Sequence, residues 1–331
     1  MRKVARRQMR AVMATEPGGP EVLEVVRVPE PEPRPDHELV MVTMAGVNPA
    51  DILMRENQWL GPIRFPFVPG RELVGVLDDG RRIAGLTSSG AYAQRALVER
   101  GLYWEIPDEL TDEDACGLTL DGLTAWHLLH TALRIERYEV LVVSDAASAV
   151  GCLAIQLAKS HGAFVVAMDR GKHRLQAALD LGADAIVDCS ETDGLIDRIR
   201  EATGGLPIDA ALDLVGGDIF PALFQSLRFR GRIVVDGCSS RNRGDIAFRD
   251  LVFGSKSIIG FWLPNLFTDL HAIHNSIHTI FAAKAIGALS LPVEARYMLD
   301  DVRWAHRTLV PGNPSHGYPG KTMLNMIGYY Y

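Results

Sequence analysis

A run of small and polar residues near the middle of this 331-residue chain has the position of a phosphate-binding turn. The run SDAASAVG, from Ser144 to Gly151, follows an apolar stretch and precedes a helical one. Glycines at such a turn let backbone N–H groups approach a diphosphate at the helix N-terminus. Only Gly151 is present, and Asp145 puts a carboxylate where it would repel phosphate. The turn alone therefore fits a nucleotide site and a purely structural connection equally well.

The end of the next apolar stretch adds two conflicting signals. Asp169 stands where an acid accepts a hydrogen bond from a ribose 2′-hydroxyl and disfavours a 2′-phosphate. Arg170 and Lys172 follow, and their charges suit that phosphate. A solvated acid at a strand end would give the same pattern, so these residues leave the choice between a 2′-hydroxyl and a 2′-phosphate open.

Strand-like and helix-like stretches alternate over residues 123–264. The apolar runs typical of a buried parallel sheet are 139–143, 163–168, 185–187, 208–214, 232–235 and 257–263. The helical stretches are 123–133, 149–160, 173–181, 195–202 and 220–229. This alternation predicts an α/β domain with a doubly wound parallel sheet, whose ligand lies beyond the carboxyl ends of the strands.

The regions on either side of this domain have β character. Short apolar segments separated by Pro and Gly fill the first part, and the proline-rich run 28–38 cannot be a sheet interior. The tail ends in the strand-like GKTMLNM. We therefore predict that 9–122 and 265–331 form one further domain, preceded by a basic extension at 1–8.

Composition excludes several classes of protein. A net charge of −7 gives no broad basic surface for nucleic acid, and no apolar run is long enough for a membrane span. The cysteines form no C-x-x-C pair, so neither a disulfide framework nor a zinc ribbon is expected. They are Cys116, Cys152, Cys189 and Cys238. Free thiols indicate a reducing compartment, and we expect a cytoplasmic protein that acts on a small molecule.

Short segments in order along the chain carry a family resemblance. They are MRAVMATEPGGPEVLEV (9–25), GVNPADILMR (46–55), PFVPGRELVGV (66–76), GAYAQRALV (90–98), DGLTAWHLL (121–129), VGCLAIQLAKSHGA (150–163), LGADAIVD (181–188), LDLVGGDIF (212–220), GRIVVDG (231–237) and GK (320–321). With them the chain resembles the medium-chain dehydrogenase/reductase superfamily, within it the zinc-free branch of quinone oxidoreductases and enoyl reductases. The resemblance implies a GroES-like β domain formed by both chain ends, a Rossmann domain between them, and NADPH or NADH in the cleft. It also implies a homodimer formed through residues 257–263.

The resemblance bears on zinc as well. Zinc-dependent relatives carry a catalytic Cys where this chain has Asn48, and a His where it has Arg71. Without a thiolate and an imidazole the tetrahedral site cannot form, so we predict no metal. His271, His274 and His278 share one face of an expected helix, where a polar surface is favoured over a metal site.

Carried over position by position, the resemblance assigns site residues. Asn48 is implied as the catalytic residue near the nicotinamide and the substrate. The implied substrate pocket contains Arg55, Trp59, Phe261 and Trp262. The implied cofactor residues are Thr124, Ser148, Ala149, Val150, Gly151, Asp169, Arg170, Lys172, Val215, Gly216, Gly237 and Phe261. Each of these could instead serve only the fold.

Departures from the family pattern keep a second function open. At two positions of the turn where the family carries small residues, this chain has Asp145 and Ser148 instead. In addition, Trp59 replaces the tyrosine that protonates the substrate in enoyl reductases. An indole N–H is too weak an acid for that step. We predict a zinc-independent NAD(P)H-dependent oxidoreductase that reduces a C=C bond or quinone of an apolar α,β-unsaturated carbonyl substrate. The alternative is a non-redox family member, a cyclase or isomerase of small-molecule biosynthesis, that uses the same cleft.

Overall fold

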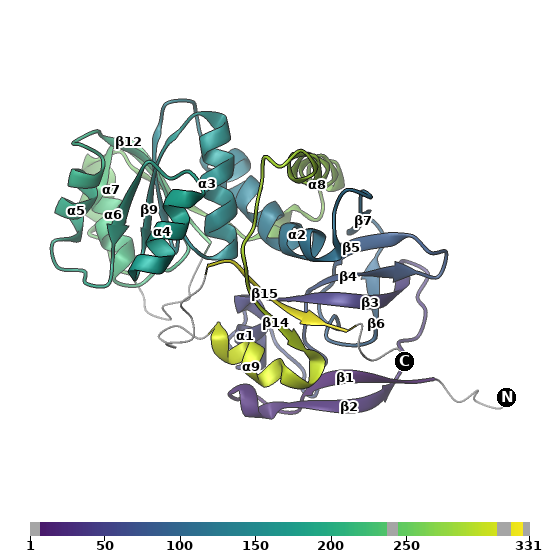
Figure 1. Ribbon diagram of the computed structural model, residues 1–331. Helices are drawn as coiled ribbons and strands as arrows, with labels where there is room; N and C mark the ends of the chain where they lie inside the picture. Colours follow the sequence, from purple (N-terminus) through teal and green to yellow (C-terminus); the bar gives the residue numbers. More distant parts are fainter. Residues whose placement is uncertain (1–6, 237–243, 310–318, 327–331) are drawn as a thin grey trace.

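Two large β-sheets and their helices make up the part of the chain that the structure, a computed structural model, describes: residues 7–236, 244–309 and 319–326. Figure 1 shows the parallel sheet in teal and green on the left, and the second sheet on the right, with most of its strands in purple and blue and β14 and β15 in yellow. This mixed architecture, a doubly wound parallel sheet beside a largely antiparallel one, confirms the predicted fold class.

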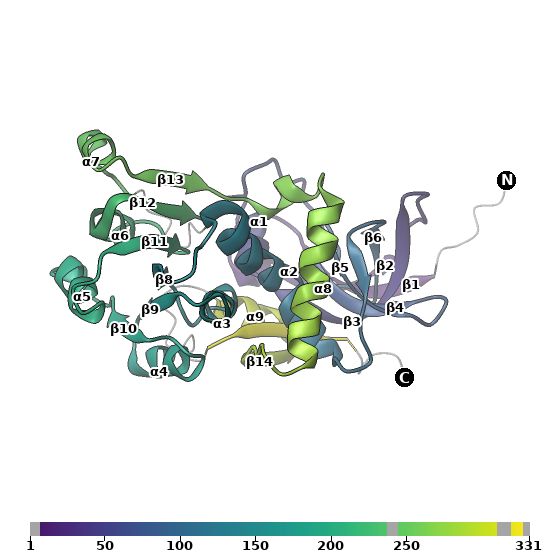
Figure 2. The same ribbon diagram turned by 90° about the horizontal axis from the view of Figure 1, so that it is seen from above.

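The parallel sheet has the strand order β10-β9-β8-β11-β12-β13, which Figure 2 shows from above. Its strands are β8 (Val140–Ser144), β9 (Phe164–Asp169), β10 (Ala185–Asp188), β11 (Ile208–Asp213), β12 (Leu227–Val235) and β13 (Ser257–Gly260). Neighbours in this order all run parallel. The chain order reverses at β8 and β11, and the carboxyl ends of two such strands are where doubly wound sheets bind their ligands.

Helices cover both faces of this sheet, which explains why its strands are apolar throughout. One face carries α2 (Asp112–His127), α3 (Ala149–His161) and α4 (Lys172–Asp180), and the other carries α5 (Leu195–Ala202) and α6 (Ile219–Ser226). Residues of β8 alternate between the faces. Leu141 and Val143 share a core with α3, whereas Val140 and Val142 share one with α5 and α6.

Two helices differ from their predicted lengths. The helix predicted over 220–229 ends at Ser226, and β12 begins at Leu227, because Leu227 pairs beside Ile208 of β11. Helix α2 begins at Asp112, about one-third of the way along the chain, rather than near residue 123. Thr111 caps it by accepting a hydrogen bond from the Asp114 N–H at 3.1 Å.

The second sheet combines strands from both ends of the described chain. Its order is β14-β15-β3-β4-β5-β7, with β6 paired to β3. The strands are β3 (His37–Val47), β4 (Glu72–Leu77), β5 (Arg82–Leu86), β6 (Arg95–Glu99), β7 (Tyr103–Glu105), β14 (Val293–Met298) and β15 (Lys321–Asn325). The hairpin β1 (Gln8–Ala14) and β2 (Leu23–Pro29), and the helices α1 (Pro49–Arg55) and α9 (Val302–Thr308), lie next to this sheet (Figure 1). Because β15 pairs with β3, Lys321 at its start lies beside residues from the first quarter of the chain.

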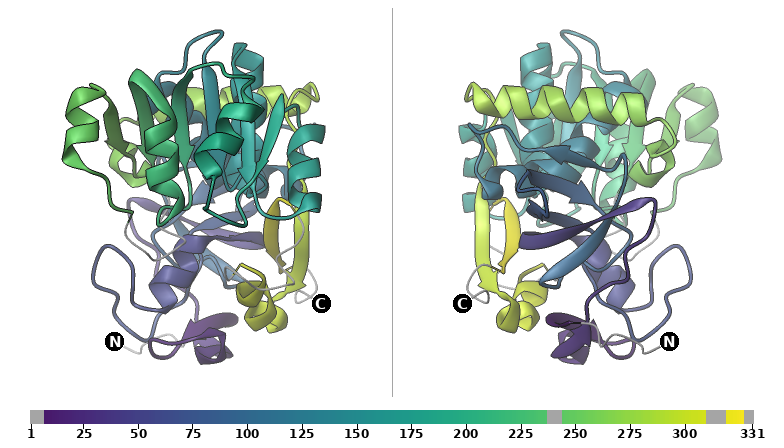
Figure 3. Two further views of the ribbon diagram at one scale, coloured as in Figure 1. Left: turned by 90° about the vertical axis from the view of Figure 1, so that its left-hand side faces the viewer. Right: turned by 90° about the vertical axis from the view of Figure 1, so that its right-hand side faces the viewer.

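Helix α2 joins the two halves of the molecule. It lies against α3 on one side and α8 (Leu270–Ala285) on the other, as Figures 2 and 3 show. Gly122 permits close contact with α8, since a Cβ there would lie 3.2 Å from Ile280. Met44 of the second sheet and Leu141 of the parallel sheet belong to one continuous core. Within the described residues, no helix has both the length and the apolar surface needed to cross a membrane.

Candidate functional site

The turn between β8 and α3 is tight although two of its expected small residues are missing. Asp145 adopts the left-handed conformation, with a φ of 48°, which Asp tolerates better than most residues. Ser148 caps α3: its Oγ accepts from the Gly151 N–H at 3.1 Å and donates to the Asp145 carbonyl at 2.7 Å. A Cβ on Gly151 would lie 2.4 Å from that carbonyl oxygen, so only glycine fits there.

Arg174 of α4 holds the two acids at this turn. Its Nη2 donates to Asp145 Oδ1 at 2.8 Å, and its Nε donates to Asp169 Oδ1 at 2.8 Å. Burial disfavours the charge, yet the two carboxylates keep the pKa of Arg174 above its usual value. The Asp145 carboxylate, which alone would repel a phosphate, is therefore paired with a cation.

Asp169 is fully engaged inside the protein. Its oxygens also accept from the Ala147 N–H at 2.8 Å and the Arg170 N–H at 2.7 Å. The residue is 4% exposed. The structure thus gives Asp169 the role of holding the turn, which is at odds with the predicted contact to a ribose hydroxyl.

A dinucleotide fits this turn in other respects. The N–H groups of Ala149 and Val150 lie in the first turn of α3, where backbone donors have no acceptor within the helix. Arg170 and Lys172 are exposed just beyond the end of β9. Helix-start amides and exposed cations are groups that bind phosphates.

A buried polar cluster lies where the second sheet meets α2. Lys321 Nζ is 2.7 Å from Glu72 Oε2 and also pairs with Asp121. The same Nζ donates to Asn48 Oδ1 at 2.7 Å. Glu72 accepts in addition from the Leu120 N–H at 2.6 Å. Asn48, the predicted catalytic residue, is therefore held in place by charges that come from β4, α2 and β15.

Electrostatics extend this cluster toward the parallel sheet. Asp121 and Glu72 raise the pKa of Lys321 although burial opposes its charge. Burial raises the pKa of Glu72, and Lys321 opposes that rise. Asp236 follows β12, where burial, together with the nearby Asp121, raises its pKa to about 7. A carboxyl group with this pKa can hold a proton near neutral pH and release it.

Two tryptophans predicted in the substrate pocket lie together. The ring centroids of Trp59 and Trp262 are 6.2 Å apart. The Arg71 guanidinium lies over Trp59, 4.8 Å from the ring centroid. Arg71 Nε is buried without a hydrogen-bond partner among the described residues. Phe261, also predicted there, is half-buried and packs on the core.

Other predicted residues have partners within the fold. Arg55 is fully buried, donates to the Gly18 carbonyl at 2.9 Å and contacts His306 Nδ1 at 3.1 Å. Its side chain is therefore engaged within the second-sheet half of the molecule, and a role in the substrate pocket stays a prediction. Thr124 Oγ1 donates to the Leu120 carbonyl at 2.8 Å, within its own helix.

The loop after β11 contains two more predicted residues. The N–H groups of Val215 and Gly216 bind Asp213 Oδ1 at 3.0 and 2.9 Å, which keeps them at the carboxyl edge of the sheet. Gly237 and Cys238 lie outside the described residues, so nothing is added to the predictions about them.

Sequence reasoning overlooked five charged residues that the structure brings into the site. Glu72, Asp121 and Lys321 stand within quoted family segments, and charged residues among apolar neighbours were the available signal. Asp236 directly follows a predicted strand, which is another such signal. Nothing in the sequence around Arg174 distinguishes it from a solvated helix residue.

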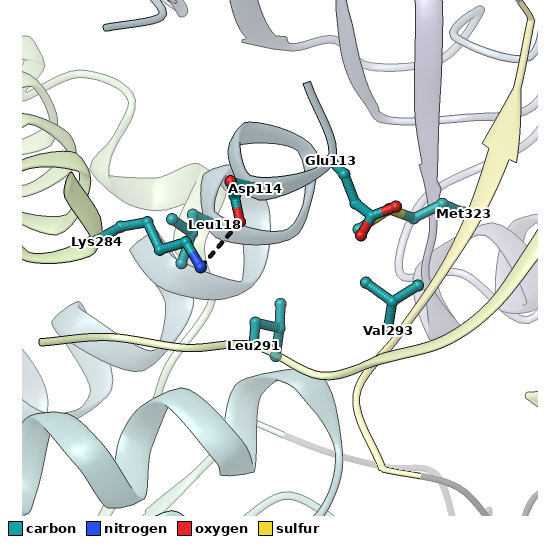
Figure 4. A pocket seen from close by; sticks show the side chains of 7 residues that line it. All are labelled: Glu113, Asp114, Leu118, Lys284, Leu291, Val293 and Met323. Atoms are coloured by element: carbon teal, nitrogen blue, oxygen red, sulfur yellow. Dashed lines mark ion pairs between the residues drawn. The ribbon is translucent and has the colours of Figure 1, made fainter. Parts of the chain in front are cut away.

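A small cavity lies away from this site. Figure 4 shows a cavity of about 20 Å³ between α2, α8 and β14, which has room for one water molecule. An ion pair of 2.9 Å between Lys284 and Asp114 lies beside it (Figure 4). In residues 7–236, 244–309 and 319–326, no group of three or more His, Cys, Asp or Glu is placed to hold a metal. The thiols that the structure describes are free and buried: Cys116, Cys152 and Cys189.

Comparisons with known proteins point in one direction. Residues 149–288 match the family model described as zinc-binding dehydrogenase. Human quinone oxidoreductase is 27% identical over 331 residues, which cover 96% of this chain and 97% of the relative. Mouse quinone oxidoreductase-like protein 2 is 31% identical over 285 residues, covering 82% and 81%. Escherichia coli quinone oxidoreductase, solved in complex with NADPH, superimposes with a TM-score of 0.89 at 26% identity, covering 96% of this chain and 100% of that one.

Proposed function

This chain belongs to the quinone oxidoreductase-like branch of the medium-chain dehydrogenase/reductase superfamily, and from that premise we propose that it is a zinc-independent NAD(P)H-dependent reductase. Its substrate is an apolar molecule that contains a quinone or a C=C bond conjugated to a carbonyl. The observation that carries the proposal is the full-length likeness to a quinone oxidoreductase complexed with NADPH.

The β8–α3 turn binds the cofactor, which supplies the hydride when bound. The N–H groups of Ala149 and Val150, in the first turn of α3, are the proposed donors for the diphosphate. Ser148 and Gly151 keep these amides in place by fixing the turn. The loop with Val215 and Gly216, at the same edge of the sheet, is the proposed neighbour of the nicotinamide.

Hydrogen-bond donors polarise the substrate carbonyl. Lys321 holds Oδ1 of Asn48, and Nδ2 of that amide lies 3.4 Å from Glu72 Oε2, which leaves a second N–H for substrate. The unpartnered Nε of Arg71 is a further donor beside the Trp59 ring. The adjacent Trp262 completes an aromatic surface on which a planar conjugated molecule can stack.

The same residues support a reaction without zinc. Asn48 and Arg71 occupy the positions at which zinc-dependent relatives carry a thiolate and an imidazole. An amide and a permanently protonated guanidinium do not form a tetrahedral zinc site. Preorganised donors can stabilise the negative charge that develops on the carbonyl oxygen in place of a Lewis acid.

We also propose that two copies associate through β13. This strand is the edge of the parallel sheet, and Ile258 on it is 41% exposed. Phe248 and Phe253 of α7 (Phe248–Phe253), which directly precedes β13, are 77% and 79% exposed. An open edge beside apolar side chains is the kind of surface that pairs with another strand.

A cytoplasmic location stays a prediction.

Cofactor titration tests the proposal. Nicotinamide fluorescence is followed while NADPH or NADH binds to the purified protein, and micromolar affinity for either is expected. Absence of binding at millimolar cofactor would exclude the reductase and leave the cyclase or isomerase alternative. After dialysis against a chelator, reduction of quinones and enones should persist; its loss, with recovery on added zinc, would refute zinc independence.

A further inference from the structure

We propose that the conjugated substrate carries a carboxylate, and that Arg71 is the specificity-determining residue that binds it. This assignment rests on the proposed function, because it names the substrate class of that same site. The ring system of the substrate stays apolar, and one negative charge beside it pairs with the guanidinium. Arg71 suits this role because the protein places its cation in the candidate pocket without a counter-ion.

Arg71 differs from other arginines that the fold encloses. Arg55, Arg174 and Arg232 each pair with an acid, at distances of 2.6, 2.8 and 2.6 Å. Arg71 is half-buried, its Nε has no hydrogen-bond partner, and no acid among the described residues forms an ion pair with it. Removing a charge from water without a partner is costly, so an anion from outside the chain would complete this site.

Asp51 is the acid whose charge acts on Arg71, but the two side chains do not bind each other. Asp51 is fully buried in α1, and its Oδ2 accepts from the Asn48 N–H at 2.9 Å and from the Tyr92 hydroxyl at 3.0 Å. Its Oδ1 has no hydrogen-bond partner among the described residues, so the guanidinium does not reach it. Burial lowers the pKa of Arg71, and the Asp51 charge opposes that effect only through space.

The acids of the neighbouring polar cluster do not serve as the counter-ion either. Glu72 directly follows Arg71 in the chain, but its Oε2 lies 2.7 Å from Lys321 Nζ. Asp121 pairs with the same ammonium group. Both carboxylates are therefore held by Lys321, and the donors of Arg71 stay available to a ligand.

The surroundings of Arg71 place the carboxylate beside the conjugated system. The guanidinium lies over Trp59, 4.8 Å from the ring centroid, and the ring of Trp59 contacts that of Trp262. Trp262 is 37% exposed, so a ligand can reach this aromatic pair. A guanidinium carries five N–H donors, so the Nε donor proposed for the carbonyl leaves those of the two Nη atoms free for a carboxylate. A short side chain that ends in a carboxylate can therefore reach Arg71 from a ring that stacks on the tryptophans.

Two acceptors that differ in charge test this assignment. One is a benzoquinone with a propanoate side chain, and the other is the methyl ester of the same compound. The methylene groups of the side chain insulate the ring, so the two quinones have closely similar reactivity. With saturating nicotinamide cofactor at neutral pH, kcat/KM of the wild-type protein should be about tenfold or more higher for the carboxylate, as a charge-assisted contact predicts.

Variants separate the charge contact from other effects of Arg71. In Arg71→Met the ratio of kcat/KM for carboxylate over ester should fall by about tenfold or more. Loss of a donor to the carbonyl affects both acceptors, so this ratio reports the contact with the carboxylate. Arg71→Lys keeps the charge without the planar fork, and its ratio should lie between those of the wild type and Arg71→Met. Arg200→Met removes an exposed arginine of α5 that pairs with Asp197, and it should leave the ratio unchanged.

The wild-type comparison needs no variant, so it decides the matter even if Arg71→Met does not fold. Equal kcat/KM values for the two acceptors, or a preference for the ester, would overturn the substrate assignment. An unchanged ratio in folded Arg71→Met would overturn the role of Arg71, and weaker cofactor binding in that variant would then assign the guanidinium to the cofactor. Failure to reduce either acceptor would instead refute the proposed function, and the substrate assignment with it.

Discussion

Lys321 keeps its charge in a place that water does not reach, and it does so because acids surround it. It is 2% exposed, yet Glu72 and Asp121 both pair with it and Asn48 accepts its third hydrogen bond. A buried charge with complete partners fixes its neighbours in one arrangement, and removal of one partner leaves the others uncompensated. At the residue scale, the orientation of Asn48 therefore depends on Lys321.

We expect Lys321→Met to cost about 3–5 kcal/mol of unfolding free energy, because it leaves two buried acids without a counter-charge. Urea denaturation measures this loss. Lys284→Met is the matched control: it removes the ion pair to Asp114 at the margin of the small cavity and should cost about 1 kcal/mol or less. If both variants lose the same unfolding free energy, the Lys321 cluster contributes no more to stability than the ion pair between Lys284 and Asp114.

Asp236 predicts a pH dependence of reduction. If its carboxyl group supplies the proton that follows hydride transfer, it must be protonated, so the rate should fall as the pH rises above about 7. Asp236→Asn should lower the rate by about 100-fold and remove that fall. A pH–rate profile of the variant that keeps the wild-type shape would assign the proton to another group.

At the element scale, packing of α9 on α1 depends on a neutral histidine. His306 is fully buried, and Arg55 of α1 contacts its Nδ1 at 3.1 Å. Burial, together with the Arg55 charge, lowers the pKa of His306 to about 3. The unfolded chain therefore binds a proton between about pH 6.5 and pH 3 that the folded chain excludes.

This contact should weaken the fold in acid. As the pH falls from about 6.5 toward 3, stability should drop by up to about 1.4 kcal/mol per pH unit from this group. His306→Asn, which keeps an acceptor for Arg55 but cannot take up the proton, should show a shallower dependence in urea denaturation at several pH values. If the unfolding free energies of variant and wild type depend on pH with the same slope, the pKa of His306 is not lowered by folding.

The elements were more predictable than the contacts between them. The parallel strands follow from their apolar runs, because burial on both faces leaves no other composition. The end of α6 at Ser226 was missed because Leu227 is taken by a sheet pairing with Ile208, which no local pattern indicates. Asp169 was placed correctly at a strand end, but its partner Arg174 lies five residues further along the chain, in the next helix, and could be recognised only in the fold. The role of Asn48 was predicted from family motifs, whereas the charges that hold its side chain come from distant segments.

At the scale of the whole molecule, α2 connects the two sheets and carries Asp121, which interacts with charged groups of both halves. Asp121 pairs with Lys321 of the second sheet and lies close enough to Asp236 of the parallel sheet to raise its pKa. The polar site is therefore formed only when both halves are assembled around α2. The proposed cofactor turn and the proposed catalytic cluster come from different sheets, so they lie in separate segments of the sequence.

The proposed dimer is testable at this scale. Ile258→Lys places a charge on the edge strand and should convert a dimer into a monomer, as measured by light scattering during gel filtration. Ile286→Lys, at a position that is 82% exposed after α8, is the control and should leave the dimer intact. A monomeric wild-type protein, or a dimer unaffected by Ile258→Lys, would contradict association through β13.

The central claim is reduction of a conjugated acceptor with a nicotinamide cofactor, and an anaerobic turnover experiment tests it most directly. The protein is mixed with NADPH and a simple benzoquinone, and oxidation of the nicotinamide and formation of the quinol are followed together. We predict that one quinol forms for each nicotinamide oxidised, at a rate that Asn48→Ala reduces by about 100-fold. Bound NADPH that stays reduced in the presence of quinone and enone acceptors alike would contradict the account.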